Sequence, residues 1–95
     1  MTVDDELVRF VEERLDEDEE RVRRGQPVPW TTEMTERAYR EVGAKRKIVI
    51  LCKVAQEPDA FGRPNIRRGV ARRILKEIAA VYADHPDYSP AWRSA

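Results

Sequence analysis

Six prolines constrain the fold of this 95-residue chain more than any other feature of its sequence. They fall in three close pairs, at Pro27 and Pro29, at Pro58 and Pro64, and at Pro86 and Pro90. Proline has no backbone N–H and disfavours helical geometry in the residue before it, so each pair interrupts regular structure. The prolines therefore predict three long segments followed by a short C-terminal tail.

The first segment, about 3–24, has the periodicity of an amphipathic helix. Its apolar residues fall within an arc of about 140° when each residue advances about 100° around a helix. These residues are Val3, Leu7, Phe10, Val11, Leu15 and Val22. Acidic residues crowd its first turn and arginines its last turn before Gly25, which suits both the helix dipole and a glycine stop. We predict a helix that buries one face.

The second segment, about 32–56, becomes apolar around its whole circumference between Ile48 and Ala55. A helix that is apolar all round is buried all round. We therefore expect this half to be the central element of the fold, with neighbours on both sides. The small pair Gly43–Ala44 would let another backbone approach closely. A β-strand over 47–54, where β-branched residues are frequent, is the alternative.

The third segment, about 65–84, is predicted to be a helix with Asn65 as its N-cap. Its apolar face is about 180° wide and comprises Ile66, Val70, Ala71, Ile74, Leu75, Ile78, Val81 and Tyr82. Arg68, Arg72 and Lys76 are expected on the opposite side. The tail, 85–95, contains Tyr88 and Trp92, two large aromatic residues that favour packing against the helices. The prediction is one all-α domain over 1–95, a three-helix bundle with an ordered aromatic tail.

Composition excludes several classes of protein. The 18 basic residues balance the 18 acidic residues, so no global field attracts nucleic acid or an anionic membrane. The longest apolar run, residues 48–52, is far shorter than the roughly 20 residues that a membrane span needs. One cysteine, Cys52, cannot form an internal disulfide, which suits a reducing compartment. We expect a cytoplasmic protein.

Residues that could carry chemistry are few. The one histidine, His85, and the one cysteine, Cys52, lie far apart in the chain, and no glycine-rich phosphate loop or nucleophile elbow occurs. Cys52 lies in the most apolar stretch and is expected to be buried. Metal ions need several His, Cys or clustered carboxylate ligands at suitable spacing. We therefore predict no enzyme activity, no catalytic, cofactor-binding or metal-binding residues, and no cofactor.

Binding is the remaining function. The basic stripe Arg68, Arg72 and Lys76 could contact phosphates of a nucleic acid or an acidic protein, although it also suits a solvated helix face. Trp92 has two interpretations, an exposed motif that binds a partner or a clasp that closes the bundle. The same two interpretations apply to Trp30, which follows two prolines, and to Phe61, in the loop between the second and third segments. Each side chain either docks on a partner or packs within its own chain.

The tail also carries a resemblance. Residues 79–93, AAVYADHPDYSPAWR, resemble the closing segment of an uncharacterised family of small proteins found in Streptomyces, related actinobacteria and their phages. Residues 7–19 and 41–48 are similar to the opening and middle helices of that family. Its members carry a longer insertion rich in Trp and His where this chain has 25–31, and some carry cysteines before the last helix, so no metal role transfers. The resemblance implies an actinobacterial or actinophage origin.

Together these patterns lead to one expected function and one alternative. The expectation is a non-enzymatic protein-interaction module, a phage or mobile-element protein acting on a host protein, with Arg68, Arg72, Lys76 and Trp92 as candidate partner-binding residues. The alternative is a nucleic-acid-associated accessory protein that uses the basic stripe. A homodimer with the second helix at the interface is also expected, because two neighbouring helices do not supply cover on every side.

Overall fold

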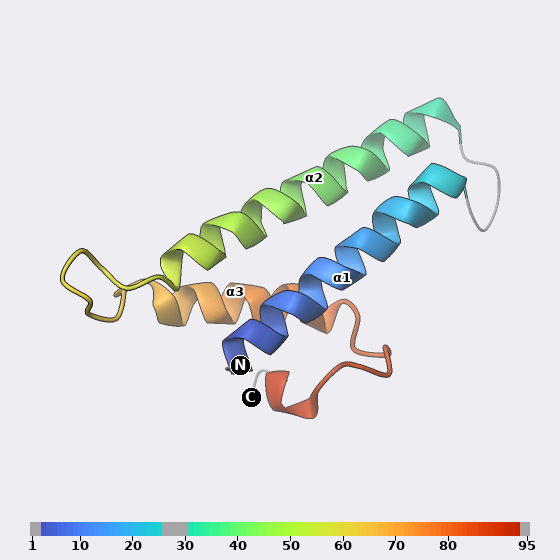
Figure 1. Cartoon of the computed structure of the whole chain (residues 1–95). Coiled ribbons are helices and arrows are strands. Elements are labelled where there is room, and N and C mark those ends of the chain that lie inside the picture. The colour runs from blue at the N-terminus through green and yellow to red at the C-terminus, as the bar shows by residue number, and fades with distance from the viewer. Residues whose placement is uncertain (1–2, 26–30, 94–95) are drawn as a thin grey trace.

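The chain forms three α-helices and a short 3-10 helix, as the computed structural model of residues 3–25 and 31–93 shows (Figure 1). The helices are α1 (Val3–Arg24), α2 (Thr32–Ala55) and α3 (Arg68–Ala80), and the 3-10 helix η1 spans Pro90–Trp92. Over the described residues there is no strand, so the alternative of a strand at 47–54 is wrong. The predicted all-α three-helix bundle with an aromatic tail is confirmed. Residues 26–30, including Trp30, lie outside the described part.

The helices make an elongated bundle with extents of 50 × 28 × 22 Å. In Figure 1, α1 and α2 run antiparallel beside each other, and α3 lies along the part of α2 nearest its C-terminal end, with α1 crossing in front of it. The tail then turns back and brings η1 close to the N-terminal end of α1.

Local chemistry sets the ends of the first two helices where the sequence predicts them. Thr31 is the N-cap of α2, and its Oγ1 accepts a hydrogen bond from the N–H of Met34 at 3.1 Å. Gly25 ends α1 with a φ of 67°, a left-handed conformation that glycine adopts without steric cost. In the last turn of α1, Nε of Arg24 donates a hydrogen bond to Oε1 of Glu20 at 2.9 Å. Residues four apart are neighbours on a helix surface, so this pair supports the helix end.

The core is centred on α1 and not on α2, which corrects the expectation from the sequence. Leu7, Val11 and Leu15 of α1 and Leu75 of α3 are fully buried. On α2 the buried residues are Val42, Val49 and Cys52, while large apolar residues of its C-terminal half are exposed. The apolar circumference of α2 exceeds what α1 and α3 cover, because both lie on one side of it.

The sequence also predicted that Cys52 of α2 is buried and that Gly43 lets another backbone approach. Cys52 is buried, as predicted, and its burial raises the pKa of the thiol. Gly43 is not a point of close approach: a Cβ atom placed on it would meet no atom within 4 Å. The glycine therefore serves no packing purpose in the described structure.

Helix α3 is shorter than the predicted 65–84. Asn65 does not cap it directly: its Oδ1 accepts the N–H of Arg67 at 2.9 Å, which closes a turn before the helix, and Arg67 is the N-cap. After Ala80 the chain continues in turns, with bonds such as Tyr82 N–H to Ala79 O at 2.9 Å. These bonds join residue i to residue i−3, so the segment after Ala80 is a helix end tightened into 3-10-type turns.

The tail packs on the helices through a cluster of aromatic rings. Trp92 is 4% exposed, and its ring centroid lies 5.0 Å from that of Phe10 and 5.6 Å from that of Tyr88. Phe10 also lies 5.8 Å from the His85 ring, edge to face. Phe10 of α1 is thus the point on which the tail docks, and the clasp is the arrangement that the structure has.

Candidate protein-interaction surface

A buried arginine holds the tail against α1. Arg14 is 4% exposed, and its Nη2 lies 3.1 Å from Oε1 of Glu17. Its Nη1 lies 2.6 Å from the ring nitrogens of His85 and 3.8 Å from Oδ2 of Asp87. Its guanidinium group also lies 5.0 Å from the centroid of the Phe10 ring, as in a cation–π contact. Arg14 therefore links the helix, the turn and the aromatic cluster.

His85 is part of this clasp. Its Nδ1 accepts the backbone N–H of Asp87 at 3.0 Å, so that nitrogen closes the turn after α3. The sequence had one signal for the Arg14 link that was missed. Arg14 lies in the middle of the apolar arc of α1, between Phe10 and Leu15, and a charged residue at such a position must find partners when buried.

The charges between the helices are largely used within the chain. Arg46 of α2 donates to Asp16 and Glu19 of α1, both at 2.7 Å, and these bonds raise its pKa. Lys53 lies 3.6 Å from Glu12. The acidic first helix therefore meets basic residues of the second helix of the same chain.

A second link joins α1 to the end of α3. The hydroxyl of Tyr82 donates to Oδ2 of Asp18 at 2.6 Å. Burial and this bond to a carboxylate raise the pKa of Tyr82 well above its usual range. The ammonium group of Lys45 on α2 lies 6.0 Å from the ring of Tyr82. Tyr82, just after α3, thus contacts both α1 and α2.

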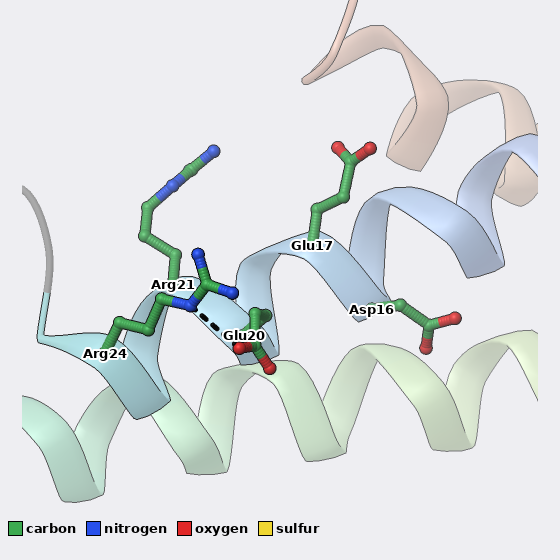
Figure 2. Close-up of a pocket in the computed structure, with 5 residues that line it drawn as sticks. All are labelled: Asp16, Glu17, Glu20, Arg21 and Arg24. Carbon is green, nitrogen blue, oxygen red and sulfur yellow. Dashed lines mark hydrogen bonds and ion pairs between the residues drawn. The ribbon is translucent and has the colours of Figure 1, made fainter.

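The hollow drawn in Figure 2 lies on α1 and has a volume of about 380 Å³. It is lined by Asp16, Glu17, Glu20, Arg21 and Arg24. Figure 2 shows Arg24 reaching Glu20 while Glu17 and Arg21 extend away from the helix. Small-molecule sites are usually lined by apolar groups with a few convergent polar ones. A hollow lined only by charged side chains of one helix lacks that character.

The described residues hold no group of three or more His, Cys, Asp or Glu side chains arranged to bind a metal ion. Among the same residues, no helix combines the length and apolar character that crossing a membrane requires.

The predicted partner-binding residues have different surroundings from those expected. Arg68, Arg72 and Lys76 are only partly exposed, because they border the buried line of Ala71, Leu75 and Ala79 and do not lie opposite it. Arg68 and Arg72 also take part in interactions within the chain. Trp92 is buried in the clasp. The structure thus brings the three basic residues together along one edge of α3.

Large apolar side chains are exposed where the sequence predicted burial. On α3, only half of the expected 180° face is buried; Val70 and Ile74, about 40° apart at 100° per residue, are exposed, and so is Val81 just after the helix. On α2, Ile48 and Leu51 are exposed too. We call these five residues the apolar face; their exposed fractions range from 39% to 69%.

The two parts of the apolar face lie on helices that pack against each other. On α2, Arg46 and Lys53 mark the side that contacts α1, and Ile48 and Leu51 lie about 150° around the helix from them. On α3, the exposed residues of the face border the buried line of the helix. The α2 part of the apolar face is therefore turned away from α1.

The loop between α2 and α3 adds two more apolar side chains. Ile66, just before α3, is 95% exposed. Phe61 is also exposed, with the guanidinium group of Arg63 lying 5.0 Å from its ring centroid. Of the two interpretations of Phe61, the structure has the exposed loop tip.

Fold and surface together define a class: a small helical bundle closed by an aromatic clasp, with a broad exposed apolar face. The chain belongs to DUF6221, a family of unknown function whose match covers residues 4–94. This match confirms that the chain belongs to an uncharacterised family. No curated protein and no solved structure matches the chain.

Proposed function

We propose that this protein is a non-enzymatic protein-interaction module, and that the apolar face is its binding surface. The observation that carries the proposal is the exposure of Ile48, Leu51, Val70, Ile74 and Val81 on two packed helices and the residue that follows them. At roughly 150–200 Å² for a fully exposed residue of this size, the five present about 500 Å² of accessible surface. The largest apolar patch on a typical monomer is of that size and is often functional.

The charge distribution supports a protein partner over a nucleic acid. The acidic residues of α1 and the basic residues of α2 pair within the chain, and the net charge is zero. The basic stripe of Arg68, Arg72 and Lys76 borders the core, so it offers phosphates less surface than a fully exposed stripe would. The apolar face, by contrast, has large side chains that gain from leaving water.

The setting is part of the proposal. The single buried cysteine favours a reducing cytoplasm. The tail resembles proteins of actinobacteria and their phages. This resemblance supports a partner that is a host protein of an actinobacterial cell, on which this chain acts as a phage or mobile-element product.

The test is capture from an actinobacterial lysate with three immobilised baits. The first bait is the natural chain, the second is the double variant Leu51→Glu with Val70→Glu, and the third is the control Met34→Glu. Met34 is an exposed apolar residue of α2 near the opposite end of the helix. We expect any lysate protein that the natural chain captures to be retained by the control and lost by the double variant. Equal capture by all three baits would contradict the proposal.

A salt series separates the alternative. Binding of DNA that weakens steeply as salt rises, and that Arg72→Ala abolishes while the double variant retains it, would favour the nucleic-acid function instead.

A further inference from the structure

We infer that the apolar face binds a second copy of this chain, in a symmetric homodimer in which α2 and α3 of each subunit pack against α2 and α3 of the other. The inference rests on the proposed function, because it names the partner of the same surface. It is argued from two features: the connection between α1 and α2 cannot reach this surface, and the area of the surface suits a dimer.

Residues 26–30 cannot cover the apolar face. They connect Gly25 to Thr31, where α2 begins. Leu51 lies 20 residues further along α2, about 30 Å away at 1.5 Å per residue. A five-residue connection that must return to Thr31 reaches only about 10 Å from it.

The area of the face fits the requirement of a dimer. A standard specific interface buries about 800 Å² on each partner, and homodimer interfaces are about 65% apolar. These two values ask for roughly 500 Å² of apolar surface on each subunit, which is what the five residues of the face present. The remaining area would come from the polar residues around the face, such as Lys47 and Arg73, both of which are exposed.

A second copy also suits the small size of the chain. A 95-residue chain also buries only about two-thirds of its unfolded surface, so cover from a second copy would enlarge a small core.

The two packed helices α2 and α3 form a layer. A two-fold axis through this layer places the same surface on both subunits, so one sequence can supply both sides of the interface. Two such layers stacked face to face make a four-helix arrangement, in which side chains of one layer fill the grooves of the other.

The experiment measures the mass of the purified natural chain by light scattering and sedimentation, from low to high micromolar concentration. We expect a mass of twice the 11.1 kDa of the chain. Leu51→Glu and Val70→Glu, each at an exposed helical position, should have the mass of one chain, and Met34→Glu should remain a dimer. Far-UV circular dichroism of each variant establishes that its helices are intact.

If a glutamate variant loses its helices, the milder pair Leu51→Ala with Val70→Ala takes its place, because alanine favours helices. The pair should raise the dimer dissociation constant at least tenfold while leaving the helical spectrum unchanged. A natural chain with the mass of one chain at every concentration would overturn the homodimer, and so would folded face variants that remain dimeric.

The two proposals can fail separately. A monomeric chain that still captures a lysate partner through Leu51 and Val70 removes the homodimer and leaves the interaction module. A monomeric chain that instead floats with phosphatidylglycerol vesicles through the same residues removes both and makes the face a membrane-binding surface.

Discussion

Replacement of Trp92 by alanine tests whether the C-terminal tail stabilises the whole bundle. The indole is 4% exposed and packs on Phe10 and Tyr88 with centroids 5.0 and 5.6 Å away. Alanine would leave a cavity in the centre of this aromatic cluster and remove both ring contacts. It would also loosen the turn that carries His85 and Asp87 to Arg14, because η1 anchors the end of that turn.

The size of the effect follows from the burial. Truncation of a buried Trp to Ala costs about 3–5 kcal/mol of unfolding free energy, and each ring pair adds about 0.5–1.5 kcal/mol beyond burial. Small domains have about 5–15 kcal/mol in total. In a domain of this size 1 kcal/mol shifts the melting temperature by about 4–8 °C, so we expect a fall of at least about 12 °C.

The assay is urea and thermal unfolding followed by circular dichroism, at one fixed protein concentration, since association would make stability depend on concentration. Tyr39→Ala is the matched control, because Tyr39 is an aromatic residue of α2 that is substantially exposed. Deletion of residues 86–95 should reproduce the loss seen with Trp92→Ala. A change below about 0.5 kcal/mol in either tail variant, the range of ordinary surface substitutions, would refute the clasp.

Three further predictions concern the rest of the bundle. Gly43→Ala should raise the unfolding free energy by about 0.5–1 kcal/mol in urea titrations, because Gly43 is helical with open space at its Cβ position; destabilisation would mean a contact that the structure lacks. Arg14→Met should cost under about 1.5 kcal/mol while Arg14→Ala costs about 2 or more, since the long side chain fills the core and its acidic partners are exposed; equal losses would show that the ion pairs dominate. The raised pKa of Tyr82 means that the folded state holds the phenol proton more tightly, so its contribution is complete below the unfolded pKa of about 10 and is lost as pH rises above it. The natural chain should therefore lose stability above about pH 10 more steeply than Tyr82→Phe does, and parallel curves of unfolding free energy against pH would contradict this.

Helix positions could be predicted because their signals are local. The prolines, the glycine stop at Gly25 and the arc of apolar residues on α1 all act within a few residues. The predicted start of α3 at Asn65 is wrong, and the reason is equally local. Asn65 can cap a helix or close a turn with the same side-chain oxygen, and the sequence does not distinguish the two uses.

The candidate site was less predictable than the helices. The sequence directed attention to Arg68, Arg72, Lys76 and Trp92, since charged stripes and aromatic residues are conspicuous. In the structure Trp92 lies in the core and the basic residues border it. The apolar face could not be recognised as a surface, because exposed and buried apolar residues look identical in a sequence.

The sequence by itself determined the three helices, the bounds of the first two to within a residue, and an apolar surface larger than three helices can cover. Only the tertiary structure decided which part of that surface is left open. Helix periodicity gives the direction of a side chain around its own axis, but not which neighbour lies in that direction. Phe10 and Arg14 fix the tail on α1. Arg46 and Lys53 fix α1 against one side of α2. The opposite side of α2, and the exposed apolar residues of the neighbouring α3, are therefore left without cover.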